Sequence, residues 1–368
     1  MLATRISLPF GLSGLLLLLL ALSALQPPPG PLARLVARLP HHAALVATSF
    51  SADGQRLITA DKRSVAAWET KAGQQLGELV SGERMQSVRH GSRGQLVATG
   101  LGGVTLFDKS LKRVAGLNPP TGWPRDAGFS PDGRLLAMGF EEEDPPEKHT
   151  GGVVLYDAAT GQERGLLAQG DPICSVQFRR DGKRLAAQCI TRSGTFFQIY
   201  EVPSGKFLTS WYTGAFSYSP SGHQFALLRR GHVAAYGADG RLLWTQPVDG
   251  GTRALAFSPT STLLLTWSPG VDSRAAAAVM VWDSATGKPI GRLEYATPPT
   301  AVRFHPKKPW LVSGLKTGQV NLRDVRTGKP VVEGLKAGSA VTTLEFDTSG
   351  RRLAVGEASG VCSLWELP

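Results

Sequence analysis

The residue types that most often carry chemistry are scattered along this sequence. Seven histidines stand at positions 41, 42, 90, 149, 223, 232 and 305, and apart from the adjacent first two none has the spacing of metal ligands. No Gly-x-Ser-x-Gly motif offers a hydrolase nucleophile, and no glycine-rich loop followed by lysine offers a phosphate site. The sequence therefore names no catalytic, cofactor-binding or metal-ligating residue.

One segment concentrates carboxylates. Residues 140–150 read FEEEDPPEKHT, and six of them are candidate contacts for a partner: Glu141, Glu142, Glu143, Asp144, Glu147 and His149. Such a group can clamp a basic partner or a Ca²⁺ ion, and the alternative is a solvated acidic loop without a ligand. A second long segment, residues 268–278, offers Asp272 and Arg274 as further contacts.

The elements that position these segments repeat along the chain. An anchor residue, aromatic in all but one case, precedes a turn of the Ser-Pro-Asp-Gly type eight times. The eight anchors are Phe50, His90, Phe129, Phe178, Tyr218, Phe257, Phe304 and Phe346. They are 39 to 49 residues apart, the spacing of a propeller blade. The residue seven positions after each anchor is apolar, so each such pair is predicted to face each other across a hairpin. His90 is expected to be a core histidine rather than a ligand.

Six of the units continue with an aromatic residue followed by an acid, as in Trp68-Glu69 and Trp282-Asp283, and then a turn and a short fourth strand. In these features residues 33–368 resemble the WD-repeat β-propeller family, as a divergent member of bacterial, exported type. The resemblance implies an all-β fold: a single closed eight-bladed β-propeller with four antiparallel strands per blade. Seven blades and one irregular unit are the alternative.

The ring is predicted to close through its first strand. The last unit ends at Pro368 directly after Trp365-Glu366, so it has no fourth strand of its own. The segment Ala33–Leu39 (ARLVARL) precedes the first unit and has the pattern of a fourth strand. We expect it to complete the eighth blade, because an open ring would leave strand edges exposed to aggregation.

The resemblance also implies a buried His–Ser/Thr–Asp–Trp network in well-formed blades. Only the first unit approximates this network, with His42 or the neighbouring His41, Thr59, Asp61 and Trp68. We interpret it as a structural turn network that satisfies buried polar groups rather than as a catalytic His–Asp pair.

The cysteines allow one disulfide. Cys174 lies four residues before the anchor Phe178, and Cys189 lies four residues after its partner Leu185, so the hairpin places the two cysteines opposite each other. A cross-strand disulfide is one reading, and two small buried apolar residues are the other. Cys362 is the odd thiol.

The N-terminus has the pattern of an export signal. Residues 1–25 contain Arg5, a leucine-rich apolar stretch and small residues, which predicts a hydrophobic helix that is either a cleaved signal peptide or an uncleaved membrane anchor. Residues 26–32 (QPPPGPL) form a proline-rich linker, and residues 33–368 form the propeller. The protein is predicted to be exported: periplasmic, secreted or tethered to a membrane.

The net charge of +11 favours weak attraction to an anionic envelope surface. Basic residues are dispersed over all units without a long run, so no nucleic-acid footprint is predicted. We expect a monomer.

Together these features predict a non-catalytic protein–protein interaction scaffold outside the cytoplasm, as the resemblance implies for most family members. Antiparallel strands place all second-to-third strand loops on one face of the ring, and both long segments belong to these loops. That face is therefore the predicted binding surface for a protein or peptide. The alternative is a propeller enzyme, or a small-ligand or metal-binding protein that uses the central channel.

Overall fold

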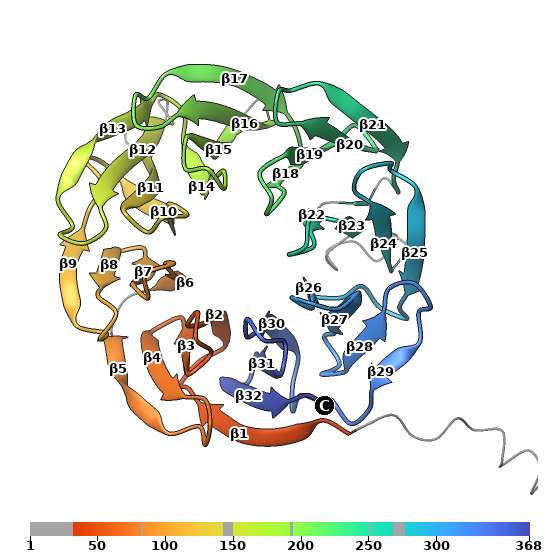
Figure 1. Cartoon of the computed structure of the whole chain (residues 1–368). Coiled ribbons are helices and arrows are strands. Elements are labelled where there is room, and N and C mark those ends of the chain that lie inside the picture. Colours follow the sequence, from red (N-terminus) through yellow and green to blue (C-terminus); the bar gives the residue numbers. More distant parts are fainter. Residues whose placement is uncertain are drawn as a thin grey trace, which may run out of the picture.

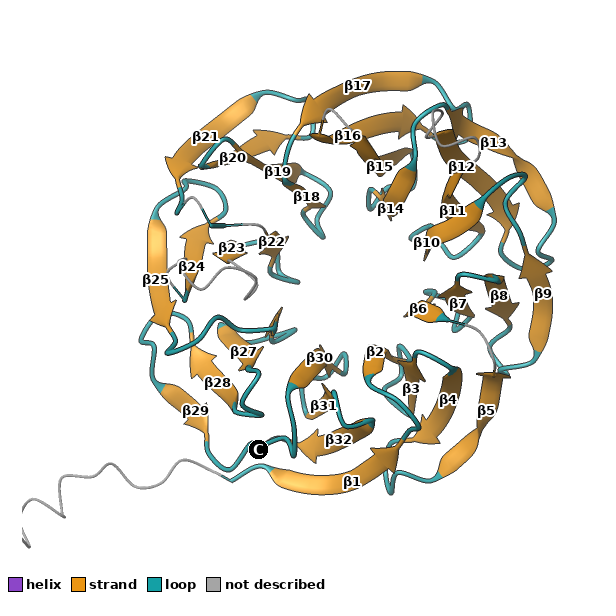
Figure 2. Cartoon of the chain, turned by 180° about the vertical axis from the view of Figure 1, so that it is seen from behind, coloured by secondary structure: helices purple, strands orange, loops and turns teal. Residues whose placement is uncertain are grey.

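The chain folds into a ring of eight four-stranded antiparallel sheets around a central axis (Figure 1). The computed structural model describes residues 32–81, 84–142, 150–191, 194–249, 251–252, 254–267 and 277–368. Within these ranges the structure consists of strands and their connections, as seen from the opposite face in Figure 2, and contains no helix able to span a membrane. The helix predicted over residues 1–25 lies outside the described residues. The eight-blade prediction is confirmed, and the seven-blade alternative is wrong.

The blades are numbered 1 to 8 in the order of their anchors, and strands run from the channel outward. The first, innermost strands are β2 (Leu45–Phe50), β6 (Met85–His90), β10 (Trp123–Phe129), β14 (Ile173–Phe178), β18 (Ala215–Tyr218), β22 (Ala254–Phe257), β26 (Ala301–Phe304) and β30 (Val341–Phe346). The second strands are β3 (Arg56–Asp61), β7 (Leu96–Gly100), β11 (Leu135–Glu142), β15 (Arg184–Thr191), β19 (Gln224–Arg229), β23 (Leu263–Trp267), β27 (Trp310–Gly314) and β31 (Arg352–Glu357).

The third strands are β4 (Ser64–Glu69), β8 (Gly103–Phe107), β12 (Thr150–Asp157), β16 (Gly194–Glu201), β20 (His232–Gly237), β24 (Ala278–Asp283), β28 (Val320–Asp324) and β32 (Val361–Glu366). The fourth, outermost strands are β5 (Gln75–Ser81), β9 (Arg113–Leu117), β13 (Glu163–Gln169), β17 (Phe207–Tyr212), β21 (Leu242–Pro247), β25 (Pro289–Glu294), β29 (Pro330–Val332) and, for blade 8, β1 (Arg34–Pro40).

The anchor pairs set the register of seven blades as predicted. In blade 1, for example, Phe50 lies opposite Leu57. Blade 2 differs, because His90 lies opposite Leu96 and the predicted partner Val97 lies opposite Arg89. The cause is the turn: the amide of Gly91 donates to the carbonyl of Gln95, four residues on, whereas the corresponding bond in blade 1 spans five residues.

The first strand of the chain closes the ring. β1 pairs antiparallel with β32 of blade 8, so that Arg34 lies opposite Glu366 and Leu39 lies opposite Cys362 (Figure 1). Leu39 is fully buried in the cluster between blades 8 and 1, together with Leu45 and Leu364. The predicted closure is confirmed, and it buries an edge strand that would otherwise be open to other chains.

Polar contacts near the channel also hold neighbouring blades together. The carboxylate of Asp126, on β10, accepts hydrogen bonds from the Ser175 hydroxyl and the Val176 amide of blade 4 at 3.1 and 3.0 Å. It also pairs with the guanidinium of Arg89 of blade 2 at 3.0 Å. One buried carboxylate therefore ties three consecutive blades, which favours a rigid ring.

Candidate functional site

The two faces of the ring are built differently. The connections between first and second and between third and fourth strands emerge on one side, which we call the turn face. The other connections emerge on the opposite side, which we call the loop face. Every turn-face connection has four or five residues, whereas loop-face connections have between two and ten. Uniform turns serve the fold, and variation in length is typical of a binding surface.

The structure places part of the predicted acidic site on the loop face. Glu141 and Glu142 end β11 there. The remaining predicted contact residues lie outside the described residues: Glu143, Asp144, Glu147, His149, Asp272 and Arg274.

Both described carboxylates have partners. Glu141 pairs with the guanidinium of Arg125 at 3.3 Å, and Glu142 accepts a hydrogen bond from the Thr150 hydroxyl at 3.0 Å. Over the described ranges no group of three or more histidine, cysteine or carboxylate side chains is arranged to hold a metal ion.

Sequence reasoning missed three exposed apolar side chains at the loop-face ends of strands. Trp123 begins β10 opposite Glu141 and is 53% exposed. In the next blade, Ile190 near the end of β15 is 55% exposed, and Tyr212 at the end of β17 is 47% exposed. The Tyr212 ring packs edge-on against Phe196 at 5.2 Å, which orients it. Trp123 occupies none of the repeat's aromatic positions, and this is the signal that could have revealed it.

The histidine of the blade 1 network is His41, so the assignment to His42 is wrong. The Nε2 atom of His41 lies 2.6 Å from the Thr59 hydroxyl, which also accepts the Trp68 indole N–H at 2.6 Å. His41 Nδ1 lies 3.6 Å from the Asp61 carboxylate. His42 takes part only through its backbone amide, which donates to Asp61 at 3.1 Å, because the connection after β1 turns its side chain away from the network.

Asp61 is completely buried, and its carboxylate binds backbone amides. Its carboxylate accepts amide hydrogen bonds from His42, Ala43, Arg63 and Ser64. Burial alone would raise the pKa of Asp61, but the amides of Arg63 and Ser64 and the nearby imidazole outweigh it and lower that pKa. Burial lowers the pKa of His41 against the attraction of Asp61, so this histidine favours its neutral form. The interpretation as a structural turn network fits this geometry, in which every group is occupied within the fold.

The cysteine geometry predicted from the hairpin is wrong. Cys189 lies opposite Ile173, and Cys174 is the extra residue of a β-bulge between Ile173 and Ser175. Both cysteines are free thiols, and Cys362 is a third, buried one. The Cys174 thiol donates instead to the carbonyl of Gln188 at 3.4 Å. Burial raises the pKa of Cys174 to about 11 and that of Cys189 to about 12, so both are protonated at neutral pH.

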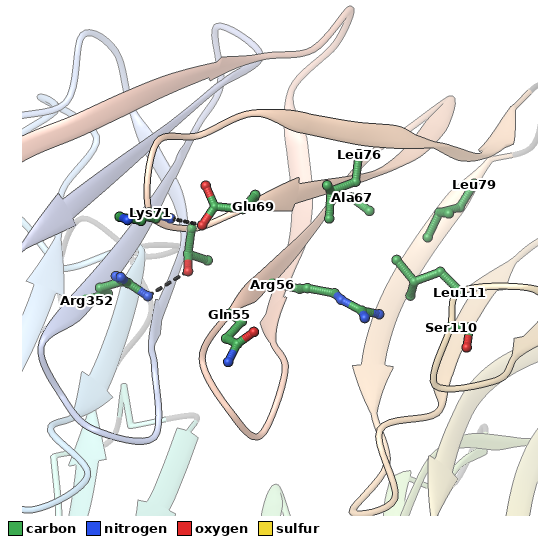
Figure 3. A pocket seen from close by; sticks show the side chains of 11 residues that line it. Gln55, Arg56, Ala67, Glu69, Lys71, Leu76, Leu79, Ser110, Leu111 and Arg352 are labelled. Carbon is green, nitrogen blue, oxygen red and sulfur yellow. Dashed lines mark hydrogen bonds between the residues drawn. The ribbon is translucent and has the colours of Figure 1, made fainter.

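The turn face carries a pocket of about 730 Å³ at the boundary of blades 1 and 2 (Figure 3). Its apolar lining includes Leu76 and Leu111. Its charged lining comprises Arg56, Lys71 and Glu69 of blade 1 and Arg352 of blade 8. The two arginines also have structural tasks. Arg56 donates to the carbonyl of Lys109 at 2.8 Å, and Arg352 donates to the hydroxyl of Thr70 at 2.6 Å. The pocket thus combines an apolar wall with positive charge, and no nucleophile paired with a base lies among its lining residues.

Comparisons with known proteins agree with the fold and go no further. No family model and no curated protein matches the sequence. Among solved structures, the computationally designed Ika8 protein superposes with a TM-score of 0.70 at 18% identity, covering 91% of this chain and 100% of that chain. The Dos1 propeller superposes with a TM-score of 0.70 at 14% identity, covering 91% of this chain and 95% of that chain. At these identities the likeness shows a β-propeller fold, and the WD-repeat resemblance stays a prediction.

Proposed function

We propose that this chain is a non-catalytic interaction scaffold that acts outside the cytoplasm and binds a protein partner through its loop face. The observation that carries the proposal is the contrast between the faces: connections on the turn face have four or five residues, whereas those on the loop face have between two and ten. A rigid ring whose connections vary widely in length on one face is suited to recognition.

The loop-face ends of blades 3 and 4 have the composition of a contact surface. Trp123 and Tyr212 are aromatic and about half exposed, and Trp and Tyr are enriched among the residues that dominate binding energy. Glu141 and Glu142 lie beside Trp123 in the same blade. This arrangement favours a partner segment that presents apolar side chains next to lysine or arginine.

The location outside the cytoplasm is proposed from residues 1–25, whose pattern is that of a signal peptide or an uncleaved anchor. Sequencing the mature N-terminus distinguishes the two, since a start near residue 24 excludes the anchor. The WD-repeat resemblance supports the scaffold role by analogy with the family, and we expect a monomeric ring.

The partner and the face can be tested together. Crosslinking in cells followed by affinity capture should identify neighbours of the wild-type chain. The double substitution Trp123→Ala and Tyr212→Ala should reduce recovery of the true partner about ten-fold or more, because buried aromatic anchors each contribute about 2 kcal/mol. The matched control is Leu166→Ala, which removes a side chain of similar exposure (43%) in the middle of outer strand β13.

Each substitution should lower the free energy of unfolding by no more than about 1 kcal/mol, because the replaced side chains are about half exposed. Equal recovery of every neighbour from the double variant and the wild type would reject the loop-face assignment. Loss of recovery in the Leu166→Ala control alone would place the interface on the outer rim instead.

A further inference from the structure

Positive charge is concentrated on the turn face. The fifteen turn-face connections contain 16 lysines and arginines against six aspartates, a net charge of +10. The described residues of the loop-face connections contain six lysines and arginines against three acids, a net charge of +3. The basic residues are dispersed in the sequence, but the alternation of the strands places 16 of the 40 in the connections on one side of the ring.

The cations are distributed over all blades in unequal numbers. Each of the eight blades contributes at least one lysine or arginine to its turn-face connections, such as Lys71 in blade 1, and blades 4 and 7 contribute four each. After the aspartates are counted, these connections have a positive net charge in blades 2, 4, 6 and 7 and a net charge of zero in the other four. Positively charged blades at several places around the ring match an extended anionic plane better than a compact acidic protein.

Exposed apolar side chains fringe the same face. Eleven large apolar side chains are exposed among the described residues, and six of them lie at the turn-face end of an outer strand. These six are Leu35, Leu76, Phe207, Leu208, Leu242 and Leu243. Lys206 directly precedes Phe207, and Arg241 directly precedes Leu242. Apolar side chains next to cations are typical of segments that lie in the headgroup region of a bilayer.

The strand that closes the ring also begins at this face. Arg34, the first residue of β1, lies opposite Glu366 at the turn-face end of β32. The sequence that precedes it holds the apolar stretch Ile6–Leu25. The apolar N-terminal segment therefore precedes the strand that begins on the turn face, where the cations and exposed apolar side chains lie.

We propose that the turn face docks on an anionic lipid bilayer, with the rim side chains of blades 1, 4, 5 and 8 in the headgroup region. The cationic pocket of blades 1 and 2 then faces the lipid headgroups, with Leu76 at its wall. This inference goes beyond the proposed function, since it concerns the face that does not bind the protein partner. Docking by the turn face leaves the loop face directed away from the membrane and open to that partner.

A fluorophore placed on either face of the full-length chain tests the docking, whether or not residues 1–25 are cleaved. One probe is attached at Leu243→Cys on the turn-face rim, and the other at Ile190→Cys on the loop face, two sites of similar exposure at 44% and 55%. Vesicles of phosphatidylcholine with about 30% phosphatidylglycerol supply the anionic surface, and pure phosphatidylcholine is the comparison. The readout is quenching by iodide in the aqueous phase.

Anionic vesicles should lower iodide quenching at position 243 about three-fold or more and leave position 190 unchanged, because only the rim side chains enter the headgroup region. Two charge-matched triple variants complete the test. The turn-face variant should raise the lipid concentration that gives half-maximal protection of position 243 about ten-fold or more; it combines Lys183→Glu, Lys206→Glu and Lys288→Glu. Lys62→Glu, Lys316→Glu and Lys336→Glu on the loop face should change it less than about two-fold.

Three outcomes would overturn the proposal. The first is an equal change in iodide quenching at positions 243 and 190, and the second is an equal effect of the two triple variants on the lipid concentration for half-protection. The third is that soluble heparin or an acidic protein protects position 243 from iodide as strongly as anionic vesicles do. The last outcome would indicate a polyanion or protein site in place of a bilayer. The proposed loop-face function is tested separately by the Trp123 and Tyr212 substitutions, so either proposal can fail without the other.

Discussion

Deletion of residues 31–39 is expected to lower the melting temperature by about 10 °C or more. β1 supplies the whole fourth strand of blade 8, and its loss removes the β1–β32 hydrogen bonds and the buried side chain of Leu39. Each hydrogen bond contributes about 0.5–1.5 kcal/mol, and truncation of a buried leucine alone costs about 2–5 kcal/mol. Differential scanning calorimetry gives the melting temperature directly.

A pair of point variants separates closure from a general effect of shortening the chain. Leu39→Ala should destabilise the ring by about 2–5 kcal/mol, because Leu39 is completely buried. Leu35→Ala on the same strand should cost less than about 1 kcal/mol, because Leu35 is 37% exposed. Wild-type melting of the deletion variant would contradict the closed ring.

Acid should destabilise the ring through His90. Burial, reinforced by the positive charge of Arg56, lowers the pKa of His90 to about 4, against the opposing charge of Asp53. Its imidazole Nδ1 lies 2.9 Å from the hydroxyl of Ser49 in the neighbouring blade. The unfolded chain binds this proton near pH 6.5 and the folded chain only near pH 4. The stability that His90 contributes is therefore complete above pH 6.5 and is lost as the pH falls toward 4.

The expected loss is about 2–3 kcal/mol, since one unit of pKa corresponds to 1.36 kcal/mol. Urea unfolding at a series of pH values between 4 and 7.5 measures it. His90→Phe introduces the residue found at most other anchors. It should reduce the loss of unfolding free energy between pH 7.5 and pH 4 by about 2–3 kcal/mol. A residual slope is expected, because burial also lowers the pKa values of His41 and His305. An unchanged slope in His90→Phe would contradict the assignment.

The fold could be predicted because its repeating unit is short and strongly patterned. Each anchor and its partner report a hairpin with one buried face, and eight repetitions in register leave little freedom for another architecture. The closing role of residues 33–39 followed from simple bookkeeping of strands, because the eighth unit lacked one. The predicted pairing of His90 in blade 2 was wrong by one residue. The turn there is one residue shorter, and the pattern of glycines does not distinguish the two turn lengths.

The details of the site depend on backbone features that spacing does not report. The bulge at Cys174 shifts the following pairing by one residue, so counting from Phe178 placed the wrong residue opposite Cys189. Which of two adjacent histidines faces inward depends on the direction in which the chain leaves β1.

Charge segregation was hidden in the sequence for a different reason. Lysines and arginines are dispersed along the sequence. Their excess on the turn face becomes visible only when each connection is assigned to a face of the ring. Summing charge over alternate connections would have revealed the cationic turn face from the sequence.

Closure of the ring by β1 fixes the two faces on which both functional proposals depend, and one substitution tests it directly. Leu39 and Cys362 lie opposite each other on paired strands and are buried in the same cluster. Leu39→Cys is therefore expected to form a disulfide with Cys362 under oxidising conditions, which peptide mapping by mass spectrometry of the non-reduced, alkylated protein detects. Arg38→Cys, whose position lies opposite Ser363, should remain a free thiol. A linked peptide joining position 39 to Cys362 is the predicted result, and a freely alkylated thiol at position 39 would contradict the closed eight-bladed ring.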